Sequence, residues 1–265
     1  MSDKNLAYFL IILLGSIALK TQGQGDPLLR VEIETRSDEA KYRVIPCGDP
    51  GAMMFYKTTV SEDMYNFWVF VFYNKMMNEA WKQDVPVFEN MNYADHVLKG
   101  NELYCFFYDS EKKKSEDYNF QLLKIKLDQG SYELYSGLLP LNSKFVDFKI
   151  LGEMVIVGIN VESEHAGLYT FNMASREINT QYEFPEQDSR VESLYIDEAN
   201  QSCSAIFNVH ESKTSYYLVL HEFDINGQEL RSLKIAPEAG KKFNTGKVAK
   251  VSGDVKLVFG TFGVV

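Results

Sequence analysis

The chain has 265 residues, with 27 Lys plus Arg against 37 Asp plus Glu, and a formal net charge of −10. This charge repels phosphate backbones, so the composition argues against a nucleic-acid-binding protein. Aromatic residues make up 14% of the chain, a share that suits β-strands with large side chains packed between sheets.

The first residues differ in character from the rest of the chain. Lys4 precedes an apolar run at residues 6–19, which is short compared with the about 20 residues of a membrane-spanning helix. Residues 21–23 are Thr-Gln-Gly, which offers small residues where a signal peptidase cleaves. We therefore expect residues 1–23 to be a signal peptide and the mature protein to be periplasmic, cell-surface or extracellular. The alternative is an uncleaved anchor, which would be the only contact with a membrane.

A four-strand unit is clearest at residues 191–236. Four short apolar runs are separated there by turn residues, and the last turn, Asn226-Gly227, is typical of two-residue hairpins. The pattern recurs at a period of roughly fifty residues, within the range of propeller blades. An apolar or aromatic residue followed by Asn or Asp marks the turn after the third run: Tyr73-Asn74, Leu127-Asp128, Phe171-Asn172 and Phe223-Asp224.

The second run of each unit is apolar almost throughout, as in MVIVGI from Met154. A strand with one wet face would alternate, so both faces of these strands should be covered, as in blades packed between neighbours. We predict an all-β fold, a β-propeller-like and incomplete or open array of about 4.5 four-stranded antiparallel meander blades. The blades are expected at residues 42–87, 93–138, 145–184, 191–236 and, in part, 247–265.

The two ends of this array raise a question of closure. Residues 24–41 contain LLRVEIET, which predicts one strand followed by a linker, and the last unit stops after its second strand. An open strand edge is a liability in a folded protein. Either the strand at residues 29–35 completes the last blade, or the chain is a piece of a longer propeller; we favour the longer propeller.

The cysteines number three, so at least one thiol is unpaired. Cys105 and Cys203 lie in second strands and are expected to be small buried side chains. Cys47 lies in a turn and is expected to be the most exposed thiol. The histidines and carboxylates match no metal-binding or catalytic motif, so no cofactor, metal ligand or catalytic residue is assigned.

The loops between the second and third runs are acidic or contain histidine. In a meander repeat these loops emerge on one face, where binding residues of repeat folds gather. Such a face would attract a basic protein or another cationic ligand, although ordinary solvated loop tips remain the alternative. The candidate binding residues are Asp63, Asp117, Glu164, His165, His210 and Glu211.

The four-strand period, the export segment and the turn after the third run resemble those of secreted β-propeller repeat proteins common in Bacteroidota. The resemblance covers residues 42–265, without a WD dipeptide or a kelch double glycine, and it implies an architecture and an interaction surface but no functional residues. The leading expectation is an exported, non-enzymatic binding or scaffold module at the cell envelope. The alternative is a partial propeller of a glycan-active hydrolase or lyase whose catalytic residues lie beyond this chain.

Overall fold

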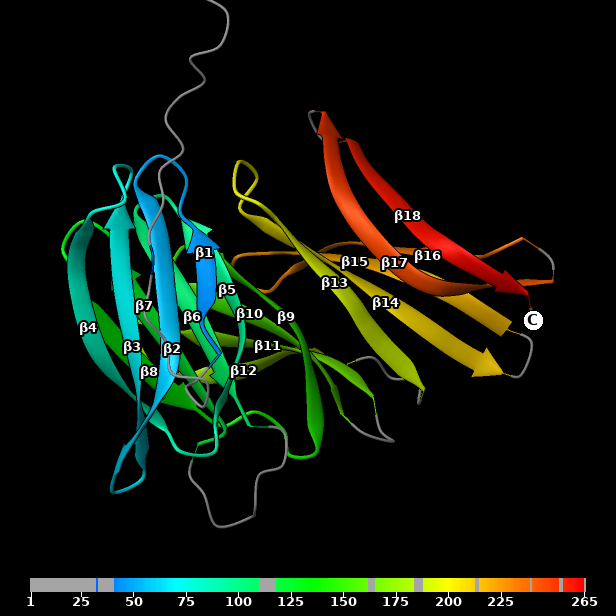
Figure 1. Ribbon diagram of the computed structural model, residues 1–265. Helices are drawn as coiled ribbons and strands as arrows, with labels where there is room; N and C mark the ends of the chain where they lie inside the picture. Colours follow the sequence, from blue (N-terminus) through cyan, green and yellow to red (C-terminus); the bar gives the residue numbers. More distant parts are fainter. Residues whose placement is uncertain are drawn as a thin grey trace, which may run out of the picture.

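The computed structural model describes residue 32 and residues 41–109, 118–161, 165–183, 188–212, 215–238, 240–252 and 255–264. The described residues form strands and turns without a helix, arranged as four four-stranded sheets and one two-stranded sheet. The sheets follow one another as the blades of an open array (Figure 1). The predicted all-β, propeller-like fold with an incomplete last blade is confirmed.

Each blade is an antiparallel meander, because strands adjacent in the sequence are also adjacent in the sheet. Blades 1 and 2 consist of β1 (Arg43–Pro46), β2 (Gly51–Glu62), β3 (Tyr65–Asn74), β4 (Glu79–Phe88), β5 (Asn92–Lys99), β6 (Glu102–Tyr108), β7 (Phe120–Lys126) and β8 (Tyr132–Gly137). Blades 3 to 5 consist of β9 (Ser143–Leu151), β10 (Met154–Val161), β11 (Ala166–Asn172), β12 (Ile178–Glu183), β13 (Ser189–Asp197), β14 (Ser202–Ser212), β15 (Ser215–Asp224), β16 (Glu229–Ile235), β17 (Lys241–Ser252) and β18 (Val255–Val264).

The Asn or Asp that marks the turn after the third strand has a structural cause. Oδ1 of Asn74 accepts hydrogen bonds from the backbone N–H groups of Met76 at 2.9 Å and Asn78 at 3.2 Å. Asn172 and Asp224 accept equivalent backbone hydrogen bonds in blades 3 and 4. A short side-chain carbonyl or carboxylate thus closes the hairpin between the third and fourth strands of blades 1, 3 and 4, which explains why the marker repeats in them.

The apolar core lies between the blades. Alternate side chains of β6 show this arrangement, because Leu103, Cys105 and Phe107 pack against blade 1 whereas Tyr104 and Phe106 pack against blade 3. All five side chains are buried. The second strand is therefore covered on both faces, as its continuous apolar sequence predicted.

The expectation that Cys47 is an exposed thiol is wrong. Its side chain is 2% exposed and lies with Cys105 in the core between blades 1 and 2. The turn that follows is tight, with the Cys47 N–H bonded to the Gly51 carbonyl at 2.8 Å, and the thiol points inward, 3.5 Å from the carbonyl oxygen of Ile45. Burial raises the pKa of the Cys47 thiol. Cys105 and Cys203 are buried as predicted, and all three cysteines are free.

The expected export segment cannot be compared with the fold, because residues 1–23 lie outside the described residues. The same holds for the expected strand at residues 29–35, apart from the exposed Glu32. Among the residues that are described, none belongs to a helix long and apolar enough for a membrane crossing. Export of the chain therefore stays a prediction.

Candidate functional site

The first strands of the blades form the inner surface of the array. They can be followed from left to right in Figure 1 as β1, β5, β9, β13 and β17. Of these, β9 contacts both β5 and β13, and β13 contacts β17. We call the side chains that these five strands expose the inner surface.

A β-bulge recurs in four of these strands. In each, the register with the second strand shifts so that a residue in the first half of the first strand is left unpaired. A bulge bends the strand and turns its side chains in a new direction. The unpaired residues are Ala94, Val146, Glu192 and Asn244, and the residues that follow them are Asp95, Asp147, Ser193 and Thr245.

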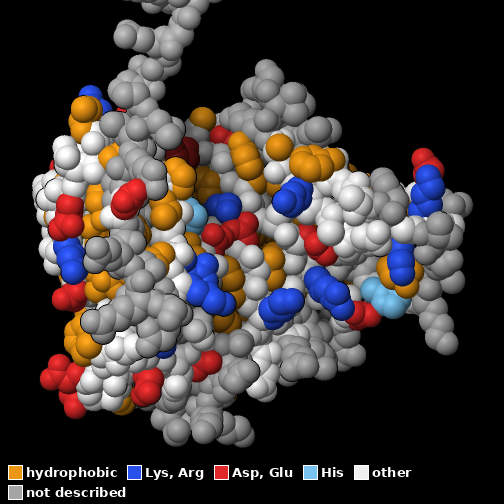
Figure 2. Space-filling model, viewed as in Figure 1, with side chains coloured by type: hydrophobic (Ala, Val, Ile, Leu, Met, Phe, Trp, Pro, Cys, Tyr) orange, Lys and Arg blue, Asp and Glu red, His pale blue; other side chains and the backbone are white. Residues whose placement is uncertain are grey.

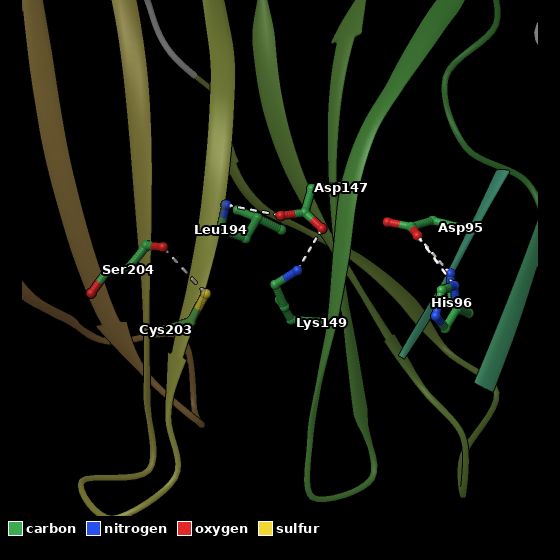
Figure 3. A network of polar contacts seen from close by, with 7 residues as sticks. All are labelled: Asp95, His96, Asp147, Lys149, Leu194, Cys203 and Ser204. Carbon is green, nitrogen blue, oxygen red and sulfur yellow. Dashed lines mark hydrogen bonds and ion pairs between the residues drawn. The ribbon is translucent and has the colours of Figure 1, made fainter. Parts of the chain in front are cut away.

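Two of the residues after a bulge join one blade to the next. Oδ2 of Asp147 accepts a hydrogen bond from the backbone N–H of Leu194 at 3.2 Å, and Oδ1 lies 2.6 Å from Nζ of Lys149 (Figure 3). Oγ of Ser193 donates to the carbonyl of Gly246 at 3.3 Å. These bulges therefore place polar side chains where successive blades meet.

Asparagines of the second strands make a second polar link between blades. Oδ1 of Asn160 accepts a hydrogen bond from the Val191 N–H at 2.7 Å. Nδ2 of Asn208 donates to the Phe243 carbonyl at 3.2 Å and to Oε1 of Glu192 at 3.3 Å. Burial raises the pKa of Glu192, against the opposing effect of the hydrogen bond from Asn208.

The first strands of blades 1 and 2 carry a more accessible polar cluster. Oδ1 of Asp95 accepts a hydrogen bond from the His96 backbone N–H at 2.8 Å, and Nδ1 of His96 lies 2.7 Å from the Tyr93 hydroxyl. The Arg43 guanidinium lies over the Tyr93 ring, 4.8 Å from its centroid. Burial raises the pKa of Tyr93, so its hydroxyl stays protonated and can donate to His96. The side chains of Asp95 and His96 are 43% and 36% exposed, so a ligand can reach them.

Cationic side chains outnumber carboxylates on the first strands, although the whole chain is acidic. Figure 2 shows Lys and Arg side chains distributed across the face that carries these strands. The carboxylates of the first strands are Asp95, Asp147, Glu192 and Asp197. The cations include Arg43, Lys144, Arg190, Lys242 and Lys247. They also include Lys99, Lys149 and Lys241, which form ion pairs with Glu198, Asp147 and Glu238.

The acidic loop face predicted from the sequence is only partly described. Asp63 is exposed at the β2–β3 turn, where its backbone has a φ of 53°. Asp117 and Glu164 lie outside the described residues. Nε2 of His165 lies 3.4 Å from Oε1 of Glu183. A row of carboxylates across four blades therefore stays a prediction.

The loop residues of blade 4 already have partners within the chain. His210 binds the Asp188 carboxylate through Nδ1. Glu211 accepts a hydrogen bond from Oγ of Ser215 at 2.7 Å and lies 3.9 Å from Nζ of Lys234. These contacts reduce the field that Glu211 can offer a cationic ligand. Elsewhere too, no group of three or more His, Cys, Asp or Glu in the described ranges is arranged to hold a metal ion.

No protein-family model matches the chain, and no curated protein sequence matches it. Among solved structures, a cobalt-substituted Synechocystis ACO, an apocarotenoid oxygenase, is similar with 8% identity and a TM-score of 0.48, over 84% of this chain and 56% of that one. The β-propeller domain of the Trilobed protease from Pyrococcus furiosus has 10% identity and a TM-score of 0.41, over 67% and 58%.

A prolyl endopeptidase structure has 9% identity and a TM-score of 0.47, over 81% of this chain and 34% of that one. The chain therefore spans just over half the length of the oxygenase and about a third of the endopeptidase. Every TM-score is below 0.5, so the fold assignment rests on the sheet topology of this chain, and no activity is carried over.

Proposed function

We propose that this chain is a non-enzymatic binding module whose inner surface binds an acidic polypeptide. The observation that supports this proposal is a basic inner surface on a chain of net charge −10. Lys144 and Arg190 are exposed on the adjacent strands β9 and β13. Because charges interact over roughly 8 Å at physiological salt, a ligand at these strands experiences the nearby cations more than the distant carboxylates.

The cluster at β1 and β5 supports the same role. Arginine and tyrosine are enriched at protein interfaces, because each combines apolar area with hydrogen bonding. Arg43 and Tyr93 are already stacked, with the guanidinium 4.8 Å from the ring centroid. Stacking limits the motion of the long Arg43 side chain, so less conformational entropy is lost when it binds a carboxylate.

Binding of a fluorescein-labelled decaglutamate peptide, followed by fluorescence anisotropy, tests the proposal. The double variant Lys144→Glu and Arg190→Glu should weaken binding by about tenfold or more, and added salt should weaken it further. The control double variant, Lys82→Glu and Lys126→Glu, makes the same charge change on exposed residues of β4 and β7. It should leave the affinity within about twofold.

Two outcomes would overturn the inner-surface proposal. One is absence of decaglutamate binding, and the other is equal weakening by both double variants. A decalysine peptide provides the opposite test, because the predicted loop face of Asp63, Asp117, Glu164, His165, His210 and Glu211 should bind it. Binding of decalysine in place of decaglutamate would favour that loop face as the binding surface.

Export of this module is a second part of the proposal. It is supported by the short apolar run at residues 6–19 and by the small residues of Thr21-Gln22-Gly23. Intact-mass measurement of the protein from an envelope fraction should give the mass of a chain that lacks residues 1–23. A mass that includes these residues would favour the uncleaved anchor instead.

A further inference from the structure

The bulge in β5 places two polar side chains on the face toward blade 1. Tyr93 and His96 are three residues apart, so a regular strand would put them on opposite faces. Ala94 is unpaired, however, and the register places Tyr93 opposite Phe107 and His96 opposite Cys105. Phe107 and Cys105 both pack toward blade 1, and directly paired side chains point to the same face. Tyr93 and His96 therefore both face blade 1.

Arg43 reaches the same place from blade 1. It lies opposite Phe55 in the register of β1 and β2, and Phe55 is buried in the core between blades 1 and 2. Arg43 therefore points toward blade 2, where its guanidinium lies over the Tyr93 ring, 4.8 Å from the centroid. The Phe55 ring holds the Tyr93 ring in place, with the two centroids 4.9 Å apart. Arg43 and His96 thus come from two blades to one tyrosine.

The polar pair in β5 is not required to form a bulge. The other three bulged first strands have apolar side chains or glycine at these two positions: Phe145 and Phe148, Val191 and Leu194, Phe243 and Gly246. Phe148 and Leu194 are 0% and 5% exposed, so this position contributes to the core in blades 3 and 4. The side chain of His96, at the same position, is 36% exposed. Its place in the repeat therefore indicates a role other than packing.

Tyr93 determines which ring nitrogen of His96 carries hydrogen. Its hydroxyl lies 2.7 Å from Nδ1 of His96. Burial raises the pKa of Tyr93, so the hydroxyl is protonated at neutral pH and donates to Nδ1. A neutral imidazole has a single N–H, which therefore lies on Nε2. Among the described residues none accepts a hydrogen bond from Nε2, so this N–H is available to a ligand.

The Arg43 side chain offers donors of the same kind. It is exposed, and in the described part of the chain no carboxylate pairs with it. Stacking on Tyr93 uses the flat face of the guanidinium and leaves the N–H groups at its edges available. These donors form a planar fork that matches the two oxygens of a carboxylate. Arg43 and His96 therefore provide N–H donors and one permanent positive charge around a single ring.

Asp95 limits the charge of the ligand. Its register partner Phe106 packs toward blade 3, so Asp95 leaves β5 on the face opposite His96. Its Oδ1 nevertheless accepts a hydrogen bond from the His96 backbone N–H at 2.8 Å and lies 3.7 Å from Nδ1 (Figure 3). A negative charge at this distance repels an anion in proportion to the charge of that anion. A singly charged carboxylate is therefore favoured over a doubly charged phosphate.

We propose that Arg43 and His96 form a carboxylate-binding site at the seam between blades 1 and 2. The guanidinium of Arg43 binds both carboxylate oxygens, and Nε2 of His96 donates a further hydrogen bond. Tyr93 is a positioning residue for both side chains. The carboxylate belongs either to an acidic polypeptide or to a free organic acid. Only the first source rests on the function proposed for the inner surface.

The first test follows acetate binding to the full chain by NMR of the histidine ring nitrogens, with His96 assigned through His96→Gln. The signals should show hydrogen on Nε2 of His96, and acetate should shift the Nε2 signal. Arg43→Gln should weaken acetate binding by about tenfold or more, and Arg43→Lys, which keeps the charge without the fork, by less. The matched control Arg176→Gln removes an exposed arginine that lies over the Tyr135 ring at 5.8 Å. It should leave the affinity within about twofold.

Two further variants test the neighbours of the site. Tyr93→Phe keeps the ring and removes the hydroxyl, so the His96 hydrogen should distribute between Nδ1 and Nε2 and acetate should bind about threefold more weakly. A purely structural role of Tyr93 would leave the hydrogen on Nε2. Asp95→Asn removes the nearby negative charge and should strengthen acetate binding by about threefold.

Three results would overturn the site. They are an unchanged Nε2 signal on addition of acetate, hydrogen found on Nδ1 in the parent chain, and equal weakening by Arg43→Gln and Arg176→Gln. The fluorescein-labelled decaglutamate peptide then identifies the source of the carboxylate. Weaker peptide binding in Arg43→Gln would support the acidic polypeptide. Acetate binding without decaglutamate binding would support a free organic acid and overturn the function proposed for the inner surface.

Discussion

The two faces of blade 4 differ in how completely they are covered. Toward blade 3, the side chains of Cys203, Ala205 and Phe207 are buried. They belong to a core that residues from all four strands of blade 3 form or pack against. Toward blade 5, Leu220 is buried but Leu233 is nearly half exposed. Both faces have similar apolar sequences, so the difference comes from the neighbour. A blade face is buried only as far as the next blade has strands to cover it.

Two phenylalanines in second strands should show the largest difference between a covered and an open blade. Phe207 in β14 is fully buried and its ring centroid lies 5.3 Å from that of Tyr182. Phe207→Ala should lower the free energy of unfolding by about 3–5 kcal/mol. Phe259→Ala in β18 should lower it by less than about 1 kcal/mol, because the side chain is half exposed. Urea denaturation of both variants measures this, and equal shifts would contradict the comparison.

Two residues of fourth strands, Trp81 in β4 and Leu233 in β16, should show a smaller difference in the free energy of unfolding, in the same direction. Trp81→Ala removes a half-buried ring and its hydrogen bond to Leu127, so we expect a loss of roughly 2–3 kcal/mol. Leu233→Ala removes a side chain without a third strand to contact, and should cost at most about 0.5 kcal/mol. Thermal denaturation of each variant tests this pair. A large loss in Leu233→Ala would show that another segment covers blade 4.

The polar links between blades should have a modest effect. Asn160→Ala removes the acceptor of the Val191 N–H, and should cost about 1–2 kcal/mol because that buried donor is left unpaired. Asn208→Ala removes a donor to the Phe243 carbonyl on the side of the incomplete blade, and should cost about 1 kcal/mol or less. Urea midpoints should therefore decrease more for Asn160→Ala. A larger decrease for Asn208→Ala would show that the hydrogen bond to blade 5 stabilises the fold more than the hydrogen bond from Val191 to Asn160 does.

The covered face of blade 4 should also make stability depend on pH. His221 is buried against the ring of Tyr182, and burial lowers its pKa, although Glu229 acts in the opposite direction. The unfolded chain therefore binds a proton below about pH 6.5 more readily than the folded chain does. Stability should decrease as the pH falls through this value, and His221→Gln should reduce that decrease. An unchanged pH profile of the urea midpoint in this variant would contradict the assignment.

Much of the fold could be predicted, because its signals are local. The continuous apolar sequence of the second strands predicted two covered faces, and Val157 and Phe207 are buried as expected. The aromatic-Asn or aromatic-Asp pair predicted the turn after the third strand, since Asn172 and Asp224 close that turn with their own side chains. Each of these features depends on residues near one another in the sequence.

The inner surface could not be predicted in the same way. A bulge is defined by two residues opposite one on the partner strand, so the positions of Asp95 and Asp147 depend on register rather than on local pattern. The sequence nevertheless contained an indication of this surface, because Asp95 and Asp147 are charged residues inside first strands of the repeat. Cys47 was misjudged for a related reason, since a turn at the seam between two blades is buried by the neighbouring sheet.

The meander topology has a consequence for how the molecule opens. All strand pairs in the described chain join strands of one blade, and the strongest contacts between blades join successive ones. The free energy of the array is then close to a sum of terms for single blades and for each interface between neighbours. Among the described strands, β18 pairs along one edge only, whereas β14 pairs along both. Local unfolding should therefore begin at the two-stranded sheet, and protection of backbone amides from hydrogen exchange should decrease from β14 to β18.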